Sequence, residues 1–402
     1  MKKFLAAVML LMILSGVGCA GAEPQNLSGS VNQFCWKYFA TLERKENIFY
    51  SPYGIHCALS ILANGASGDT RKEILNALEV DSLDELNAAH KKFSAAAEKN
   101  YRGENIFGEF NLLLVNEKIF TRGLDKNFQG VVADVYKSDV RKSNFSDGDL
   151  KKISRWVSDK TDGFIPDYKS IATSATLTDL LNVVYFKGAW KIPFKSANTL
   201  EDSFTNLDGS CAPALMMNNV FKNKIAYFAD EKFKGIELPY TSNAALYLIL
   251  PTDDVALNVA DAWNAETFEY RENFLDCLSN CSVFSGEVVV RLPKFESDIE
   301  NNLVENFKAM GLKKSFTAAA EFFNIVKDTP LKIGNVQHRA KVKVDEQGTE
   351  AAAVTEVVMV ATAAPNFEPP QRVYFIANRP FVFVIRDVES GVILFAGAVN
   401  RL

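Results

Sequence analysis

The sequence predicts an α+β fold with sizeable mixed or antiparallel sheets. Helical periodicity dominates the first hundred residues, strand patterns dominate after residue 179, and the elements mix without a regular strand–helix–strand alternation. No linker rich in Pro, Gly or Ser divides the chain of 402 residues. We therefore expect a single domain over residues 23–402.

The first predicted elements are helices. Apolar residues recur at helical spacing over residues 28–45. Ser51 followed by Pro52 is typical of an N-cap and a first helical position, and this helix should end in the Gly-Ala-Ser-Gly of residues 65–68. Helical patterns also predict helices at residues 69–78, 83–99, 149–163, 256–278 and 299–310.

Strand predictions depend on runs of β-branched and aromatic residues between turn residues. These runs fall at residues 110–120, 179–187, 212–222, 235–240, 245–250, 286–295 and 331–345. FVFVIRD and GVILFAGAV close the chain as two more predicted strands, with Glu389, Ser390 and Gly391 in the turn between them.

The N-terminus has the pattern of a secretory signal peptide. Two lysines precede an apolar run over residues 4–14, and small residues follow it. We expect residues 1–22 to be removed after Ala22, and the rival interpretation is a lipid anchor at Cys19, as in bacterial lipoproteins. Either way we expect a secreted, extracellular or periplasmic protein. No later apolar run reaches the ~18 residues of a transmembrane span.

Charge and cysteine content exclude several functional classes. The net charge of −5 arises from 44 basic and 49 acidic residues in mixed order, so we expect no nucleic-acid partner. Five cysteines follow Ala22, an odd number that argues against a dense disulfide framework. Cys277 and Cys281 are four residues apart without a histidine nearby, so we expect no metal site and no cofactor.

The histidines do not suggest an enzyme. The chain has three, His56, His90 and His338, and a hydrolase triad needs one of them between a nucleophile and an acid. The sequence lacks a Gly-x-Ser-x-Gly motif and the glycine patterns of dinucleotide and phosphate loops. We expect His56 to be packed, His90 to be solvated, and the protein not to be an enzyme.

The segment EQGTEAAAVTEVVMVATAAP, residues 346–365, has the clearest alternation. Residues two apart in a strand share a face. From Thr349 to Met359 the odd positions are small or apolar, and both carboxylates, Glu350 and Glu356, fall on the other face. Yet a loop-like NFEPPQR follows, and an unpaired strand is a liability. Two interpretations stay open: a half-buried strand of a resting sheet, or a loop that becomes a strand when triggered.

Several blocks of the sequence resemble one family. VDEQGTEAAAVT, residues 344–355, resembles the reactive-loop hinge of the serpins, the serine protease inhibitors. NIFYSPYGIHCALSILANGASGDTRKEI is similar to their helix B region, and LLNVVYFKGAWKIPF to the main-sheet segment that carries the breach tryptophan. LPKF and NRPFVFVIRDVESGVILFAGAV resemble later strands and the C-terminus. The blocks occur in the family's order over nearly the whole chain.

The resemblance implies a serpin-like fold of three β-sheets and eight or nine helices with an exposed reactive-centre loop. It also implies a suicide substrate: a target serine protease cleaves the loop and forms an acyl-enzyme, and the loop then inserts as a strand into the main sheet. The attached protease is displaced and distorted before it can hydrolyse the ester. The alternative is a non-inhibitory serpin that acts as a binding or structural protein. We expect a monomer in either case.

The resemblance assigns the bait and the hinge to particular residues. The family's spacing from the pivot Gly348 places the scissile bond at Thr362–Ala363. The neighbouring bonds, Ala361–Thr362 and Ala363–Ala364, are the alternatives. Such small residues fit the shallow pockets of elastase-like or subtilisin-like proteases. The implied hinge residues are Gly348, Thr349, Glu350, Ala351, Ala352 and Ala353, of which Thr349 would be the first inward residue.

The resemblance also implies a shutter and a breach. The shutter residues are Ser51, Asn182 and His338, which can form hydrogen bonds across the gap where strands separate. The sequence departs from many members at Gly54, where they carry a second serine, and this puts part of the network in doubt. Trp190 is the implied breach residue. Taken alone, His338 and Trp190 would also suit ordinary core positions.

Overall fold

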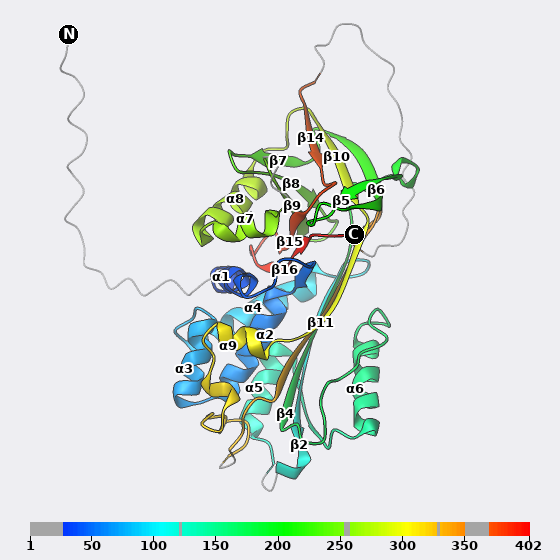
Figure 1. Cartoon of the computed structure of the whole chain (residues 1–402). Coiled ribbons are helices and arrows are strands. Elements are labelled where there is room, and N and C mark those ends of the chain that lie inside the picture. The colour runs from blue at the N-terminus through cyan, green and yellow to red at the C-terminus, as the bar shows by residue number, and fades with distance from the viewer. Residues whose placement is uncertain (1–26, 120–122, 253–257, 328–329, 350–369) are drawn as a thin grey trace, which may run out of the picture.

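The computed structural model describes residues 27–119, 123–252, 258–327, 330–349 and 370–402 (Figure 1). Several predictions lie outside these residues: the signal peptide with Cys19, the hinge residues Glu350, Ala351, Ala352 and Ala353, and the scissile bond between Thr362 and Ala363. The helices are α1 (Leu27–Ala40), α2 (Pro52–Gly65), α3 (Gly68–Ala77), α4 (Leu83–Asn100), α5 (Lys126–Tyr136), α6 (Asp147–Lys160), α7 (Val259–Ala265), α8 (Phe268–Asn280) and α9 (Val304–Ala309).

The strands of the described residues form three sheets. The main sheet has the order β11-β12-β13-β4-β2-β3, with β11 Phe295–Asn302, β12 Asn335–Val344, β13 Gly348–Thr349, β4 Thr178–Ala189, β2 Ile106–Asn116 and β3 Asp139–Ser143. The second has the order β1-β16-β15-β9-β8-β7, with β1 Ile48–Tyr50, β16 Ile393–Val399, β15 Phe381–Asp387, β9 Ala244–Pro251, β8 Phe233–Pro239 and β7 Ala226–Ala229. The third has the order β14-β10-β6-β5, with β14 Arg372–Ile376, β10 Glu287–Pro293, β6 Cys211–Lys222 and β5 Leu200–Thr205.

The central strand β4 of the main sheet is buried on both faces because helices cover the sheet from two sides (Figure 1). Helix α2 is buried at every residue except Asn64, and its apolar side chains share one core cluster with Val184 and Phe186 of β4. Helix α6 covers the opposite face, where Trp156 belongs to a second cluster with Val183. Alternate residues of β4 therefore face α2 and α6, as the two-residue period of a strand requires.

Strands β12 and β4 are direct neighbours over most of their length. They pair in parallel from Asn335 with Asp179 to Lys341 with Tyr185, and we call these seven pairs the seam. Beyond the seam the two strands diverge: both residues of β13 pair with β4, and Thr349 also pairs with Val344 of β12. Below β13, along the seam, β12 and β4 therefore pair directly, with no strand between them.

The predicted α+β fold with three sheets is confirmed, and most predicted elements match within a few residues. The predicted helix at residues 299–310 is wrong in its first part, since β11 continues to Asn302 and α9 begins only at Val304. The predicted helical stretch 256–278 is two helices, α7 and α8. The sequence patterns missed helix α5 and the short strands β1, β3, β5, β7 and β14.

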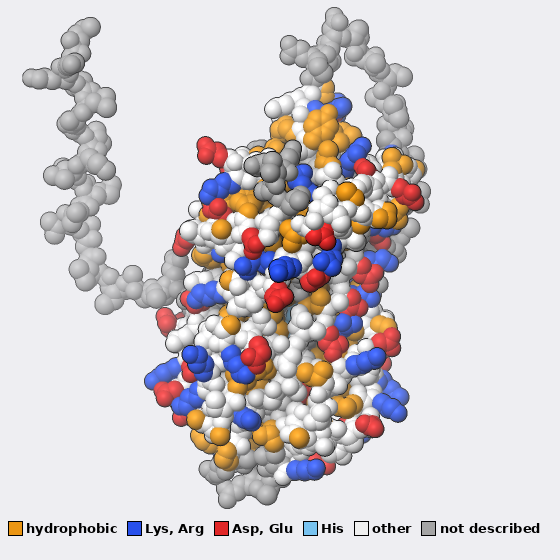
Figure 2. All heavy atoms as spheres, in the orientation of Figure 1, with side chains coloured by type: hydrophobic (Ala, Val, Ile, Leu, Met, Phe, Trp, Pro, Cys, Tyr) orange, Lys and Arg blue, Asp and Glu red, His pale blue; other side chains and the backbone are white. Residues whose placement is uncertain are grey.

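Charged side chains of both signs are interspersed over the face that Figure 2 presents. Hydrophobic side chains gather near β14 and β6 at one end of this face, where Tyr374 and Val220 are about half exposed. Within the described part of the chain, no helix combines the length and the apolar character that a membrane span needs.

Candidate functional site

The predicted hinge begins as a tight hairpin between β12 and β13. The N–H group of Asp345 donates to the carbonyl oxygen of Gly348 (2.9 Å), and the N–H group of Gly348 donates back to Asp345 (3.3 Å). Thr349 then pairs with Val344 of β12 and with Gly188 of β4. The two hinge residues within the described chain thus lie at the upper end of the seam.

Gly348 lies where only glycine fits. Its φ angle is +153°, in a region that L-residues with a Cβ rarely adopt. A Cβ atom there would lie 2.0 Å from the carbonyl oxygen of Gly188 on β4. The close approach of two backbones lets β13 enter between its neighbours.

Thr349 is fully buried, and its side chain has a specific partner. The hydroxyl groups of Tyr240 and Thr349 lie 2.6 Å apart. The ring of Tyr240 stacks on the indole of Trp190, with the two ring centroids 4.5 Å apart and the planes 12° from parallel. Burial raises the pKa of Tyr240, so its hydroxyl is neutral at any physiological pH.

Trp190 holds the turn that precedes β13. Its indole N–H donates to the carbonyl oxygen of Asp345 (2.9 Å), and its backbone N–H donates to that of Gln347 (2.9 Å). Both carbonyl groups belong to the hairpin between β12 and β13. The predicted breach residue therefore forms two hydrogen bonds to the hairpin before the hinge, and it stacks on Tyr240, the partner of Thr349.

Glu346 closes the same hairpin through charge. Its carboxylate accepts hydrogen bonds from the Lys294 ammonium group (2.8 Å) and the Thr199 hydroxyl group (2.8 Å), while the carbonyl oxygen of Glu346 accepts one from the N–H of Phe194 (2.9 Å). Burial opposes ionisation, but the hydrogen bonds outweigh it and lower the pKa of Glu346. Glu346 thus ties the hairpin to the connection between β10 and β11 and to the loop between β4 and β5.

The three predicted shutter residues lie together across the seam. The backbone N–H of Ser51 donates to Nε2 of His338 (3.0 Å), so Nδ1 must carry the ring proton and donates to Oδ1 of Asn182 (2.8 Å). Ser51 also caps α2 by accepting from the N–H of Gly54 (3.0 Å), and its hydroxyl donates to Leu394 (2.7 Å). Burial lowers the pKa of His338 to about 3, so its ring is neutral at physiological pH.

Gly54 brings α2 unusually close to β4. A Cβ atom at this position would lie 2.4 Å from Cγ2 of Val184 and 2.7 Å from Oδ1 of Asn182. A serine at this position would therefore need the helix or the strand to shift. The glycine at position 54, where the sequence departs from many relatives, therefore has a structural consequence. At this junction the N-cap residue Ser51 supplies a hydroxyl group, whereas residue 54 supplies none.

Sequence reasoning missed several residues that contact the predicted site. Tyr240 contacts Thr349, and Lys294 contacts Glu346. Glu346 lies inside the hinge-like segment VDEQGTEAAAVT, but the sequence assigned it no role. The expectation that His90 is solvated is wrong, because His90 is fully buried and its Nε2 lies 2.9 Å from Nδ1 of His56. The i, i+4, i+7 spacing of Leu86, His90 and Phe93, all buried, was the available indication.

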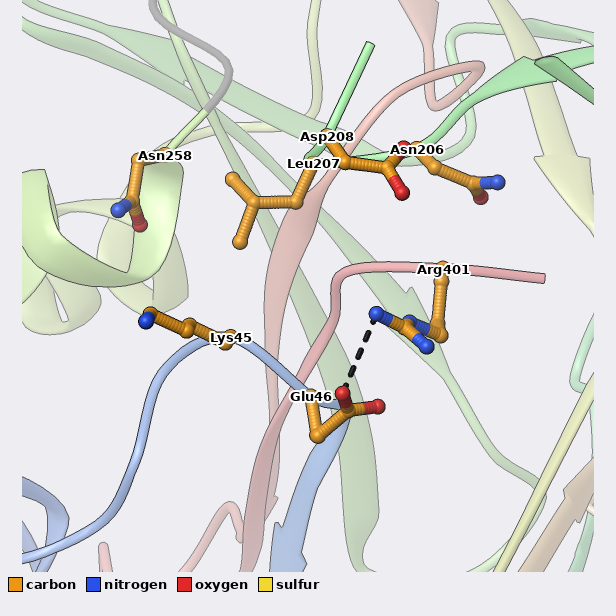
Figure 3. A pocket seen from close by; sticks show the side chains of 7 residues that line it. All are labelled: Lys45, Glu46, Asn206, Leu207, Asp208, Asn258 and Arg401. Atoms are coloured by element: carbon orange, nitrogen blue, oxygen red, sulfur yellow. Dashed lines mark ion pairs between the residues drawn. The ribbon is translucent and has the colours of Figure 1, made fainter. Parts of the chain in front are cut away.

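The described residues contain no group of three metal-ligating side chains, and the five cysteines among them are free. A separate pocket of about 470 Å³ is drawn in Figure 3. Arg401 and Glu46 form an ion pair within it (3.2 Å), so these two charges neutralise each other rather than face a ligand. The pocket contains none of the predicted site residues. Its lining comprises Lys45, Glu46, Asn206, Leu207, Asp208, Asn258 and Arg401.

Comparisons with known proteins agree on one family. The family model described as serpin (serine protease inhibitor) matches residues 29–402. Iripin-1 of Ixodes ricinus is 29% identical over 412 residues, which cover 98% of this chain and 99% of that protein. Antithrombin-III of Mus musculus is 31% identical over 367 residues, which cover 88% of this chain and 76% of that protein.

A solved structure resembles the whole arrangement. The thermophilic serpin tengpin in the native state matches with a TM-score of 0.82 and 26% sequence identity, and the match covers 94% of each chain. The likeness therefore extends over the main sheet, the other two sheets and the helices that cover them.

Proposed function

This chain belongs to the serpin family of serine protease inhibitors, and we propose that it inhibits by cleavage and insertion of residues 350–362. The observation that carries the proposal is the position of β13 at the upper end of a closed seam. The chain enters the main sheet at Thr349, and below that residue β4 and β12 pair directly. A strand that followed Thr349 into the sheet would have to part these two strands.

The register favours such an insertion. In an antiparallel pair, residue numbers rise along one strand as they fall along the other. Since Thr349 pairs with Val344 and Gly188, extending β13 by two residues would bring Ala351 between Val342 and Phe186. Those two residues each follow by one position Lys341 and Tyr185, the last pair of the seam, so the two registers agree. The sheet would need to widen, but neither strand would need to slide.

The charges on the other face fit the same register. Glu350 would enter between Lys343 of β12 and Lys187 of β4, on the face opposite α2. Opposite charges on neighbouring strands stabilise a sheet by about 0.2–1 kcal/mol for each pair. The small inward residues and the outward carboxylate thus both suit a new central strand.

The bait residues indicate the class of target. Small side chains around Thr362–Ala363 suit proteases with shallow primary pockets, so we propose an elastase-like or subtilisin-like serine protease. Trypsin-like enzymes require Arg or Lys at this position, and chymotrypsin-like enzymes require large apolar side chains.

Incubation with a panel of proteases tests the proposal. We expect an SDS-stable complex with an elastase or a subtilisin, and the released C-terminal fragment should begin at Ala363 by mass. Quantitative cleavage without a complex would support the non-inhibitory alternative. A stable complex with a trypsin-like enzyme alone would contradict the proposed target class.

We also propose export through the apolar leader. The mass of the mature N-terminus separates the two processing routes, since cleavage after Ala22 leaves an unmodified chain and lipidation leaves an acylated Cys19. A mature chain that retains Met1 would contradict export by either route.

A further inference from the structure

The turn after α6 places an aromatic side chain, Phe164, over the upper end of the seam. The buried hydroxyl group of Thr161 donates to the carbonyl oxygen of Val157 (2.9 Å) and accepts from the N–H of Ile165 (3.1 Å). The N–H of Phe164 donates to the carbonyl oxygen of Thr161 (2.9 Å). These bonds fix the backbone on both sides of Phe164, whose side chain is buried against the sheet.

The Phe164 ring lies close to cations from both strands of the seam. Nζ of Lys341 on β12 lies 4.7 Å from the ring centroid, and Nζ of Lys187 on β4 lies 5.2 Å from it. An ammonium group within about 6 Å of an aromatic ring is attracted by the electrons of its face. Tyr185, the partner of Lys341 in the last pair of the seam, has its ring centroid 5.9 Å from that of Phe164. One residue from outside the sheet therefore contacts both strands.

Phe164 belongs to the β4 side of the sheet, together with α6. The indole N–H of Trp156 on α6 donates to Asp139 of β3 (3.2 Å). Nζ of Lys160, the last residue of α6, lies 5.4 Å from the ring centroid of Phe110 on β2. Phe164 shares a buried cluster with residues of β2 and β4. Separation of β12 from β4 would therefore leave Phe164 with β4.

Lys341 belongs to the other side. Its ammonium group lies 3.2 Å from Glu296 and 3.8 Å from Asp298, both on β11, and donates to the carbonyl oxygen of Phe164 (3.4 Å). A strand that entered the seam would move β12 away from β4 by about 4.8 Å, the spacing of neighbouring strands. That displacement takes the Lys341 ammonium group out of reach of the Phe164 ring, whereas Lys187 stays beside it.

We propose that Phe164 is a positioning residue of the sheet-opening step: its ring and carbonyl oxygen bind Lys341 across the seam and oppose the separation of β12 from β4. This inference rests on the proposed function, in which the seam opens to admit a strand. Phe164 lies on the face of the sheet opposite the shutter residues Ser51, Asn182 and His338. Two separate sets of contacts thus hold the seam, one on each face.

The like charges of Lys187 and Lys341 sharpen the role of the ring. Both ammonium groups lie near the same ring, one from each strand, so they repel each other across the seam. The repulsion favours separation of the strands, and the ring offsets it by attracting both cations. Loss of the ring would remove the attraction and leave the repulsion, whereas loss of Lys341 would remove both.

Amide hydrogen exchange of the uncut protein measures opening of the seam without a protease. The exchange is followed by mass in fragments that cover residues 335–341 of β12. Phe164→Leu keeps an apolar side chain but has no ring, so these amides should exchange about three- to tenfold faster than in wild type. Phe164→Tyr keeps the ring and should exchange at the wild-type rate. Adding Lys341→Met to Phe164→Leu should slow the exchange again, because the repelling cation is gone.

Phe110→Leu is the matched control. It removes a contact of the same kind, between Phe110 and Lys160, from the same interface of α6 with the sheet, but this contact does not cross the seam. Both leucine variants should lower the midpoint of thermal unfolding. Only Phe164→Leu should speed exchange at residues 335–341, and it should also take up a synthetic peptide of residues 349–360 faster than wild type.

Three results would overturn the inference. They are wild-type exchange in Phe164→Leu, equal acceleration by Phe110→Leu, and faster exchange without faster uptake of the peptide. A wild-type protein that neither takes up the peptide nor forms an SDS-stable complex with any protease would instead refute the proposed function. The exchange rates would in that case still decide whether Phe164 holds the seam.

Discussion

The hydroxyl groups of Tyr240 and Thr349 lie 2.6 Å apart in a fully buried contact at the upper end of the seam. Thr349 is the last described residue before the proposed bait, and it already has partners on both sides in the main sheet. Its side chain faces the core beside Tyr240. The nature of residue 349 should therefore decide whether the following residues can enter.

Replacement of Thr349 by Arg should convert the inhibitor into a substrate. An unpaired charge is costly to bury, so the cut loop would enter the sheet more slowly than the acyl-enzyme hydrolyses. The measurement is the number of inhibitor molecules consumed for each protease inhibited, which should rise more than tenfold. Glu350→Gln is the matched control, because residue 350 would lie on the opposite face and glutamine brings no charge to it. An unchanged stoichiometry for Thr349→Arg would contradict the account.

Reversal of the charge of Glu346 should loosen the hinge. Glu346→Lys removes the acceptor of Lys294 and sets two cations together, which we expect to cost about 2 kcal/mol since the pair is only partly buried. Thermal unfolding should show a midpoint several degrees lower. The double variant with Lys294→Glu should recover part of the loss. The control is Lys308→Glu in an exposed pair with Glu305, where a change beyond about 0.5 kcal/mol is not expected.

Gly348→Ala should displace β13 from the sheet. The added methyl group would meet the Gly188 carbonyl oxygen at 2.0 Å in a backbone conformation that already disfavours alanine. We expect the free energy of unfolding to fall by about 2–4 kcal/mol, and proteolysis near residue 349 to become faster. Gly29→Ala in α1, where nothing lies within 4 Å of the new methyl group, should be neutral or stabilising. Equal stabilities of the two variants would argue against a tight hinge.

The buried histidines should make the protein acid-sensitive. Burial lowers the pKa of His56 to about 3, so the unfolded chain binds a proton below about pH 6.5 that the folded chain does not. Stability is therefore lost as pH falls through this range, by up to about 1.4 kcal/mol per pH unit for His56. Urea unfolding at pH 7 and pH 5 should show a loss about 2 kcal/mol smaller for His56→Gln than for wild type. Equal losses in the two proteins would mean that His56 is charged when folded.

Much of the fold follows from local patterns in the sequence. Ser51 and Pro52 begin α2 as predicted, since capping depends on residues adjacent in the chain. The long strands β4 and β12 were also predicted, because β4 has an apolar run that is buried on both faces. Strand β12 instead alternates polar residues with the buried Ala340, Val342 and Val344. The error at residues 299–302 has the opposite cause: this end of β11 is polar and exposed, so its sequence carries no two-residue apolar period.

The site was less accessible to sequence reasoning, because its contacts join distant parts of the chain. The resemblance indicated Ser51, Asn182 and His338, which do lie together. Asn182 also bonds to Glu109 of β2, which lies two residues before Asn111 on the strand face that continues into the buried Leu113. A pattern can show that such a residue faces the core, but only the packed sheet shows that it bonds to Asn182.

Thermal unfolding of the protein before and after a single cut near Thr362 tests the central claim most directly. If the uncut chain holds the seam closed and the cut loop enters it, the cleaved form should unfold more than about 10 °C above the uncut form, since a central strand adds main-chain hydrogen bonds on both sides. Cleaved and uncut protein that unfold at the same temperature would contradict the claim.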